Sequence, residues 1–166
     1  MTRRTALILT VLLLNLASAN AQFSVSLQTG ISYIEHFSAG MTFSFSDKHD
    51  LSVLYGSDFF FNRKDFLNLL LQYDYNLKRL SFAGITPAIG IKGGYAIYSN
   101  KYYRWELTEI IPFARFKYQV KEKIELFIDA GVAVSIEHSM ERISYGEIGM
   151  YREYLPEFKL GFNFRL

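Results

Sequence analysis

A serine becomes nucleophilic when a neighbouring imidazole accepts its proton and a carboxylate orients that imidazole. Two short stretches of this sequence bring the three residue types together: IEHFS, with Glu35, His36 and Ser38, and SIEHS, with Glu137, His138 and Ser139. In the second stretch His138 and Ser139 are adjacent, and a strand would turn their side chains to opposite faces. We interpret both stretches as polar residues near loops, and keep His36 with Ser38 as an alternative catalytic pair.

The sequence offers few residues for metal or thiol chemistry. It has no cysteine, and its three histidines, His36, His49 and His138, are widely separated. Zinc sites in proteins are typically built from closely spaced Cys or His ligands. We therefore predict no metal site, no cysteine nucleophile and no cofactor.

Charged residues recur at alternate positions inside apolar or small-residue segments. If these segments are strands, one face receives Asp74, Lys92, Arg115, Lys117, Glu125, Asp129, Glu157, Lys159 and Arg165. Buried charges are costly unless they pair with one another. We predict that these residues form a salt-bridged plug in a narrow interior, and keep a proton or ion path along them as the alternative.

The segments that would position these residues alternate apolar and polar side chains with a period of two, which predicts strands. In the last segment, FKLGFNFRL, one face carries Phe158, Leu160, Phe162, Phe164 and Leu166. The full set of expected strands covers residues 23–33, 37–45, 51–55, 67–77, 85–97, 110–118, 124–136 and 158–166. The glycine pair at residues 93–94 is expected to mark a bulge in the fifth strand.

The connections between these strands alternate in length. Short polar links, SDKHD, NLKRLS and QVKEK, are interleaved with longer ones that are mostly rich in aromatic residues: SDFFFNRKD, SNKYYRWE and residues 137–155. Short turns at one rim and long loops at the other are typical of outer-membrane barrels. We predict an all-β fold, an eight-stranded antiparallel up-and-down transmembrane β-barrel, in which the QVKEK turn places Lys117 opposite Glu125.

The polar face indicates which side of the barrel meets lipid. In the first two strands it carries small, uncharged residues: Ser24, Ser26, Gln28, Gly30, Ser32, Ser38, Gly40, Thr42, Ser44 and Ser46. A water-facing exterior would normally carry Lys and Glu, whereas small side chains suit the crowded interior of an eight-stranded barrel. The alternative is a soluble lipocalin-like binder with the faces reversed and an apolar cavity.

The apolar face is aliphatic and phenylalanine-rich in the middle of the strands. Tyrosines lie near the strand ends, at Tyr33, Tyr55, Tyr73, Tyr75, Tyr95 and Tyr118. Such an arrangement is typical of the aromatic girdles of membrane barrels, because amphipathic rings are favoured at the level of the lipid headgroups.

Residues 1–21 have the pattern of a secretory signal peptide, with two arginines, an apolar run over residues 6–14 and a small-x-small site at Ala19-Asn20-Ala21. We expect cleavage after Ala21 and a single outer-membrane barrel domain at residues 22–166. Cleavage removes two of the 18 Lys and Arg residues, and the rest balance the 16 Asp and Glu residues. Without a basic excess, nucleic acid is not an expected partner.

The signal peptide, the eight alternating segments and the closing FKLGFNFRL resemble small Gram-negative outer-membrane barrels of the OmpA/OmpX type and the porin-family barrels of Bacteroidota. The resemblance implies the outer membrane of a Gram-negative bacterium, in contact with lipid and lipopolysaccharide. It also implies that the apolar residues from Phe158 to Leu166 form the signal read by the barrel-assembly machinery. In that family the final residue is phenylalanine, whereas here it is Leu166.

Outer-membrane lipid A deacylases resemble this chain in architecture and use a His-x-Ser pair with a carboxylate. Here His36 and Ser38 share the parity of Thr42 and Ser44, so they should point into the barrel, away from a lipid substrate. We therefore expect a non-enzymatic barrel with a side-chain-filled lumen, whose surface loops have a structural role or bind a protein or glycan partner. A lipid-modifying enzyme and a soluble binder are the alternatives.

Overall fold

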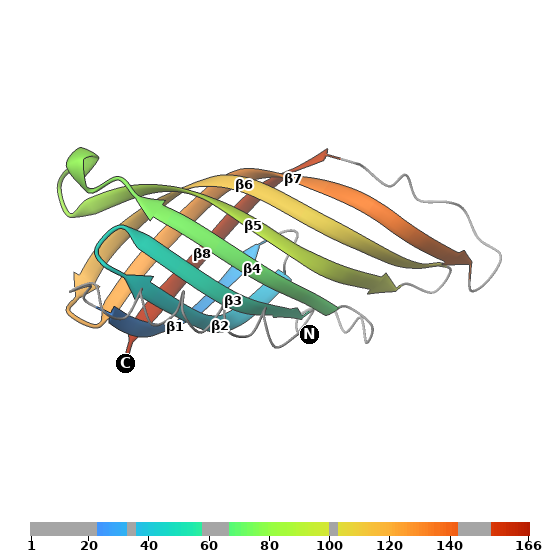
Figure 1. Ribbon diagram of the computed structural model, residues 1–166, viewed down its shortest axis with the longest axis horizontal. Coiled ribbons are helices and arrows are strands. Elements are labelled where there is room, and N and C mark those ends of the chain that lie inside the picture. Colours follow the sequence, from blue (N-terminus) through green and yellow to red (C-terminus); the bar gives the residue numbers. More distant parts are fainter. Residues whose placement is uncertain (1–22, 33–35, 58–66, 100–102, 143–153) are drawn as a thin grey trace, which may run out of the picture.

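The computed structural model describes residues 23–32, 36–57, 67–99, 103–142 and 154–166, which form eight strands of a closed barrel (Figure 1). The strands are β1 (Phe23–Ser32), β2 (His36–Phe45), β3 (His49–Ser57), β4 (Leu67–Asn76), β5 (Ile85–Ser99), β6 (Tyr103–Lys121), β7 (Ile124–Arg142) and β8 (Tyr154–Arg165). Consecutive strands are hydrogen-bonded neighbours, and every pair is antiparallel. The predicted eight-stranded up-and-down barrel is therefore confirmed.

Strand β8 closes the barrel against β1. Their register runs from Ser26 opposite Arg165 to Ser32 opposite Lys159. Because closure pairs the two strands that would otherwise be edges, each described strand has a hydrogen-bonded neighbour on both sides. A barrel of this kind satisfies its backbone groups internally, which is the condition for crossing lipid.

Alternation along the strands separates a polar inner face from an apolar outer face. In β4, Asn68, Leu70, Gln72 and Asp74 are at most 1% exposed, whereas Leu71 between them is 58% exposed. The same alternation runs through β3 and β8. Since most of the buried side chains are polar or charged, the apolar lumen expected of a lipocalin-like binder is wrong for this barrel.

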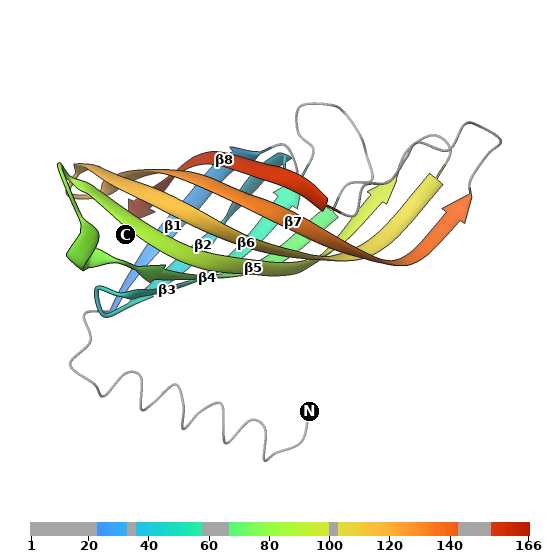
Figure 2. The ribbon, with the colours of Figure 1, turned by 90° about the horizontal axis from the view of Figure 1, so that it is seen from above.

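Strands β5, β6 and β7 have 15, 19 and 19 residues, against 9 to 12 in the other strands, and they extend together beyond one rim (Figures 1 and 2). The sequence indicates loops at SNKYYRWE and at residues 137–155, but strands occupy residues 99, 103–106, 137–142 and 154–155. That expectation is wrong because outward positions here are polar, as at Glu106 and Thr108, so the hydropathy alternation that reveals a strand is lost.

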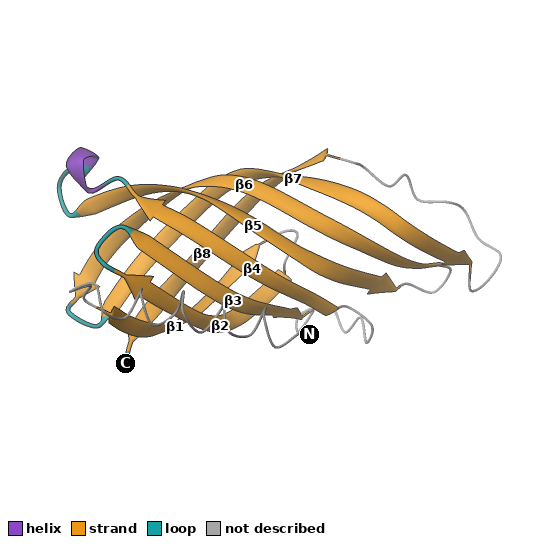
Figure 3. Ribbon diagram, in the orientation of Figure 1, coloured by secondary structure: helices purple, strands orange, loops and turns teal. Residues whose placement is uncertain are grey.

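The opposite rim is made of short connections (Figure 3). The link between β4 and β5 contains a single turn of 3-10 helix, η1 (Lys78–Leu80). No helix in the described ranges is long and apolar enough to cross a lipid bilayer. The expected signal peptide at residues 1–21, together with Tyr33, Glu35 and the centres of the long loops, lies outside the described residues.

The glycine pair in β5 does not form the expected bulge. Gly93 and Gly94 pair in unbroken register with Leu71 and Leu70 of β4. A Cβ at Gly94 would lie 2.2 Å from the carbonyl oxygen of Leu69, so this glycine allows close approach of the backbones. Gly94 thus reflects tight packing inside a regular ladder, whereas Gly93 has open space around it.

The register of the hairpin between β6 and β7 also differs from expectation. Lys117 lies opposite Phe127, and it is Gln119 that lies opposite Glu125. The difference arises because the turn occupies only residues 122–123, between β6 and β7, and a one-residue register shift lies between Gln119 and Lys121. The length of the turn in the sequence does not reveal such an irregularity.

Candidate functional site in the barrel interior

The charged residues identified from strand phase lie inside the barrel or at its short-turn mouth. Seven of them are at most 4% exposed: Asp74, Lys92, Arg115, Lys117, Asp129, Glu157 and Lys159. The other two, Glu125 and Arg165, line a pocket at the mouth. All nine residues belong to strands β4 to β8, and each of these strands supplies at least one of them.

Arg115 is the centre of this network. Its Nε and Nη2 donate to the two carboxylate oxygens of Asp129 at 2.5 and 2.7 Å, and its Nη1 donates to Asp74 Oδ2 at 2.7 Å. Nη2 also donates to Gln72 Oε1 at 3.3 Å, and Nη1 donates to Gln28 Oε1 at 3.5 Å. The planar guanidinium therefore links β6 to β7, β4 and β1 across the lumen, with the bidentate geometry that makes Arg–carboxylate pairs strong.

Towards the short-turn rim the network continues through Lys117. Its Nζ lies 2.5 Å from Asp50 Oδ2 and 3.3 Å from Asp74 Oδ2. Asn76 Nδ2 donates to the same oxygen of Asp50 at 3.0 Å. Asp50 was not expected in the interior, because its place in SDKHD predicts a turn, although it shares the parity of Ser52 in β3.

In the other direction the network continues through Lys92. Its Nζ lies 3.3 Å from Asp129 Oδ2 and 3.7 Å from Glu157 Oε1. Asp129 is thus shared between Lys92 and Arg115. Cations and carboxylates alternate along an ionic chain that comprises Asp50, Lys117, Asp74, Arg115, Asp129, Lys92 and Glu157.

Two phenylalanine rings pack against the guanidinium. Arg115 Cζ lies 4.0 Å from the ring centroid of Phe127 and 5.3 Å from that of Phe113, both within the range of a cation–π contact. Glycines make room for these rings, since a Cβ at Gly161 would lie 2.4 Å from Phe127 Cζ and one at Gly90 would lie 2.5 Å from Phe113 Cζ. The aromatic rings and the ionic chain fill the same narrow space.

Beyond the ionic chain, towards the long-loop rim, the interior becomes apolar. Six side chains there are at most 1% exposed: Leu54, Leu70, Ala96, Leu107, Ile111 and Ala133. Glu109 is buried among them and accepts a hydrogen bond from Asn68 Nδ2 at 2.8 Å. Glu109 was not expected in the interior, because the sequence predicts the sixth strand only from residue 110, although Glu109 shares the parity of Arg115.

Of the candidate catalytic pair, Ser38 can be placed, and it does not lie on the lipid-facing surface. Ser38 is buried in the barrel at 1% exposure, on the inward face expected from its parity. His36 begins β2, but its side chain is outside the described part of the structure. The direction of Ser38 supports the view that this serine does not meet a lipid substrate.

The remaining histidines contact hydroxyl groups near the ends of the strands. His138 Nε2 lies 2.7 Å from Thr108 Oγ1, and His49 Nδ1 lies 2.8 Å from the hydroxyl of Tyr73. The side chains of Glu137 and Ser139 are not described. Within the described ranges, no group of three or more His, Cys, Asp or Glu side chains could hold a metal ion.

The outer surface carries a belt of exposed apolar side chains, which we call the apolar belt. It includes Leu27, Ile31, Met41, Leu51, Val53, Leu69, Leu71, Ile89, Ile91, Ile110, Phe116, Leu126, Ile128, Val132, Phe158, Leu160 and Phe162. Tyr73, Tyr75 and Tyr118 lie towards the short-turn ends of their strands, whereas Tyr55 and Tyr95 lie towards the other ends. Two tyrosine levels with aliphatic residues between them are the arrangement expected at two lipid–water interfaces.

No protein-family model and no curated protein sequence matches this chain. Among solved structures, the barrel is similar to a major outer membrane protein from Thermus thermophilus, with a TM-score of 0.50 and 14% identity over 87% of this chain and 100% of the other. A second similar structure is Acinetobacter baumannii CarO, with a TM-score of 0.46 and 12% identity over 85% of this chain and 97% of the other. At these identities, the likeness to the Thermus protein shows a shared fold, that of a small outer-membrane β-barrel.

Proposed function

We propose that this chain is an integral outer-membrane protein of a Gram-negative bacterium, a small barrel of the OmpA/OmpX type. The observation that carries the proposal is the apolar belt, which surrounds a closed barrel whose buried side chains are mostly polar or charged. Apolar surface left in water costs about 25 cal/mol per Å², so a monomer in water would be strongly disfavoured relative to one in lipid. The bilayer is the environment in which this surface is stable.

Cell fractionation followed by gel electrophoresis tests the location. The protein should be recovered in the outer-membrane fraction. A folded barrel extracted in detergent should also migrate differently before and after boiling, because SDS alone does not unfold it. Recovery as a soluble periplasmic protein would contradict the proposal.

We further propose that the barrel is closed to solutes. The proposal is supported by two successive layers of buried side chains, the ionic chain and the apolar layer above it. An eight-stranded barrel is only wide enough for its own side chains. In planar lipid bilayers the purified protein should therefore give no steady ohmic conductance, and a lasting open channel would contradict a plugged lumen.

A non-enzymatic role is part of the proposal. It is supported by the inward direction of Ser38, which removes the serine of the His-x-Ser pair from the lipid. Cells producing wild-type protein or Ser38→Ala should have the same lipid A acylation pattern as cells without the protein, by mass spectrometry. A lipid A species that appears with wild-type protein and disappears with Ser38→Ala would favour the lipid A deacylase-like alternative.

We propose that the long-loop rim contacts lipopolysaccharide and binds a protein or glycan partner. The extension of β5, β6 and β7 supports this role, because it places the long-loop ends of these three strands beyond the rest of the barrel (Figure 2). Shortening the connection at residues 143–153 should abolish binding of producing cells to an immobilised glycan or host-protein array while leaving heat-modifiable migration intact. Unchanged binding would contradict a role for this loop.

The apolar face of β8 is proposed to serve as the signal for the barrel-assembly machinery. Its residues Phe158, Phe162 and Phe164 are exposed on the outer surface of the folded barrel. The double variant Phe158→Ser with Phe162→Ser should reach the outer membrane at a much lower level in cells than a matched double variant in β1, Leu27→Ser with Ile31→Ser. Equal levels would contradict the proposal.

A further inference from the structure

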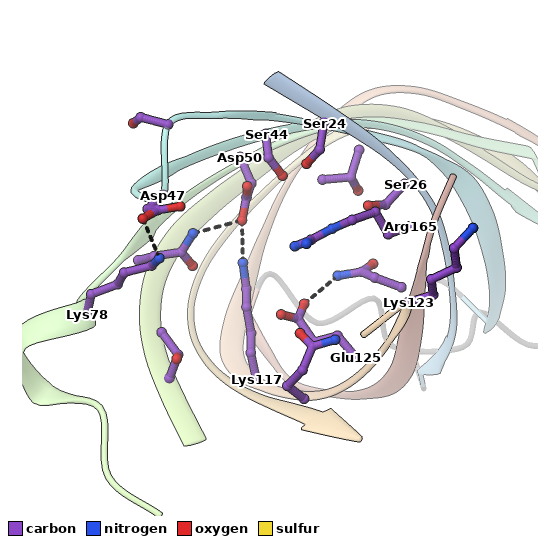
Figure 4. A pocket seen from close by; sticks show the side chains of 16 residues that line it. Ser24, Ser26, Ser44, Asp47, Asp50, Lys78, Lys117, Lys123, Glu125 and Arg165 are labelled. Atoms are coloured by element: carbon purple, nitrogen blue, oxygen red, sulfur yellow. Dashed lines mark hydrogen bonds and ion pairs between the residues drawn. The ribbon is translucent and has the colours of Figure 1, made fainter. Parts of the chain in front are cut away.

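A pocket of about 440 Å³ opens at the short-turn mouth of the barrel (Figure 4). Every side chain that lines it is polar or charged. We propose that this pocket binds a small, hydroxyl-rich anion, such as a sugar acid or a sugar phosphate. Its volume lies within the ~300–1,000 Å³ typical of small-molecule sites, and its lining excludes an apolar or aromatic ligand.

Two cations at the mouth supply the charge that such a ligand needs. The backbone N–H of Arg165 in β8 donates to the carbonyl of Lys123, in the turn before β7, at 2.9 Å, and both residues line the pocket. Neither side chain forms an ion pair with any described residue. Two cations without an ion-pair partner at one mouth favour a bound anion, because the anion would neutralise their charge.

The other charges of the pocket are already paired or hydrogen-bonded. Lys78 Nζ lies 2.8 Å from Asp47 Oδ2, and Lys117 is held by Asp50. Glu125, the remaining carboxylate, accepts a hydrogen bond from Asn163 Nδ2 at 2.8 Å. Arg165 and Lys123 are therefore the cations left to bind a ligand.

Hydroxyl groups line the wall near these cations. Ser24 and Ser44 face each other across β1 and β2, and Ser26 lies one inward position deeper than Ser24 on β1. In Figure 4 the Arg165 side chain extends across the opening between these serines and Glu125. Hydroxyls both donate and accept hydrogen bonds, so they can pair with the hydroxyl groups of a sugar while the cations hold its acid group.

The floor of the pocket is closed by the first members of the ionic chain. Asp50 binds Lys117 and Asn76 there, and Arg115 lies behind them, bound to Asp74. A ligand must therefore enter and leave by the same mouth, which suits binding and not passage. If the proposed membrane orientation holds, with short turns inside the cell envelope, the mouth faces the periplasm.

Calorimetric titration of the folded barrel in a non-ionic detergent, in phosphate-free buffer, tests the pocket. Glucuronate and glucose 6-phosphate are the probes, and glucose is the neutral control. At least one of the anions should bind saturably, with glucose at least tenfold weaker. Arg165→Gln and Lys123→Gln should each weaken that binding about tenfold, whereas Lys48→Gln, which removes a charge from the same rim outside the pocket, should leave it unchanged.

A variant with a large side chain in the pocket provides a second test, in case the loss of Arg165 or Lys123 disturbs folding. Ser44→Phe retains every charge but occupies the pocket, so it should abolish binding while heat-modifiable migration reports a folded barrel. Absence of saturable anion binding to the wild-type protein, or equal losses in Lys48→Gln and Arg165→Gln, would overturn the inference. The proposed membrane location is tested independently of the pocket. A soluble periplasmic barrel that binds glucuronate would contradict the location but support anion binding in the pocket.

Discussion

At the scale of single residues, the interior depends on Arg115. This side chain is 1% exposed and neutralises two buried carboxylates, those of Asp74 and Asp129. Replacing one partner of a buried ion pair is far more costly than replacing the whole pair, because the remaining charge is left without compensation. The stability of the barrel should therefore be more sensitive to Arg115 than to any surface cation.

Arg115→Met should lower the free energy of unfolding by about 3–5 kcal/mol, measured by urea titration in lipid vesicles. The control Arg79→Met removes an exposed cation from η1 and should change that free energy by no more than about 0.5 kcal/mol. Neutralising the partners as well, with Asp74→Asn and Asp129→Asn, should restore part of the loss. If Arg115→Met and Arg79→Met behave alike, the ionic chain does not stabilise the fold.

At the scale of the strands, close backbone approach depends on glycines at inward positions. A Cβ at Gly40 of β2 would lie 1.9 Å from the carbonyl oxygen of Val53 and 2.8 Å from Leu54 Cα, so the pairing with β3 would have to shift. Gly93 of β5 has its nearest neighbour at 4.0 Å, the carbonyl oxygen of Glu109. Gly40 is inward, like Ser38 and Thr42, whereas Gly93 is outward, opposite Leu71, so the two glycines differ both in face and in the space around them.

Gly40→Ala should destabilise the barrel by about 1–3 kcal/mol, since an added methyl group in a tightly packed site forces the backbone to move. Gly93→Ala should be neutral or stabilise by up to about 1 kcal/mol through the reduced freedom of the unfolded chain. Urea midpoints of the two variants in the same vesicles provide the comparison. Equal destabilisation by both substitutions would indicate that strand propensity, and not steric contact, determines their effect on stability.

At the scale of the whole molecule, the apolar belt determines whether the folded barrel is more stable in lipid or in water. Leu71 in the middle of β4 is 58% exposed and Leu80 on η1 is 63% exposed, so the two leucines are equally open to their surroundings. Only Leu71 lies within the belt. If the belt faces lipid, the two positions have different solvents.

Leu71→Lys should weaken folding into lipid vesicles by about 2–4 kcal/mol, the cost of a lysine near the bilayer midplane. Leu80→Lys, at the rim, should cost at most about 1 kcal/mol. The free energies come from the same urea titrations as above. Similar small effects at both leucines would mean that water surrounds the belt, and the proposed membrane location would fail.

The sequence by itself determined the parts of this protein that follow a period of two. Alternation identified the eight strands, their order and the inward phase of Asp74, Arg115 and Asp129, because within the apolar belt each outward residue must be apolar. It did not reveal the ends of β5, β6 and β7, where Glu106 and Thr108 face outwards and the hydropathy contrast disappears. Strand phase therefore predicts structure only where lipid-facing and inward-facing positions must differ in polarity.

The tertiary structure alone decided which residues meet across the lumen. The turn length predicts Lys117 beside Glu125 on the neighbouring strand, but its partner is Asp50, which reaches it from the far side of the barrel. Closure of the barrel brings Asp50 of β3 to Lys117 of β6, and local alternation does not encode which strands meet across the lumen. For the same reason the pocket at Arg165 could not be foreseen, since its lining comes from strands and turns that meet only when the sheet closes.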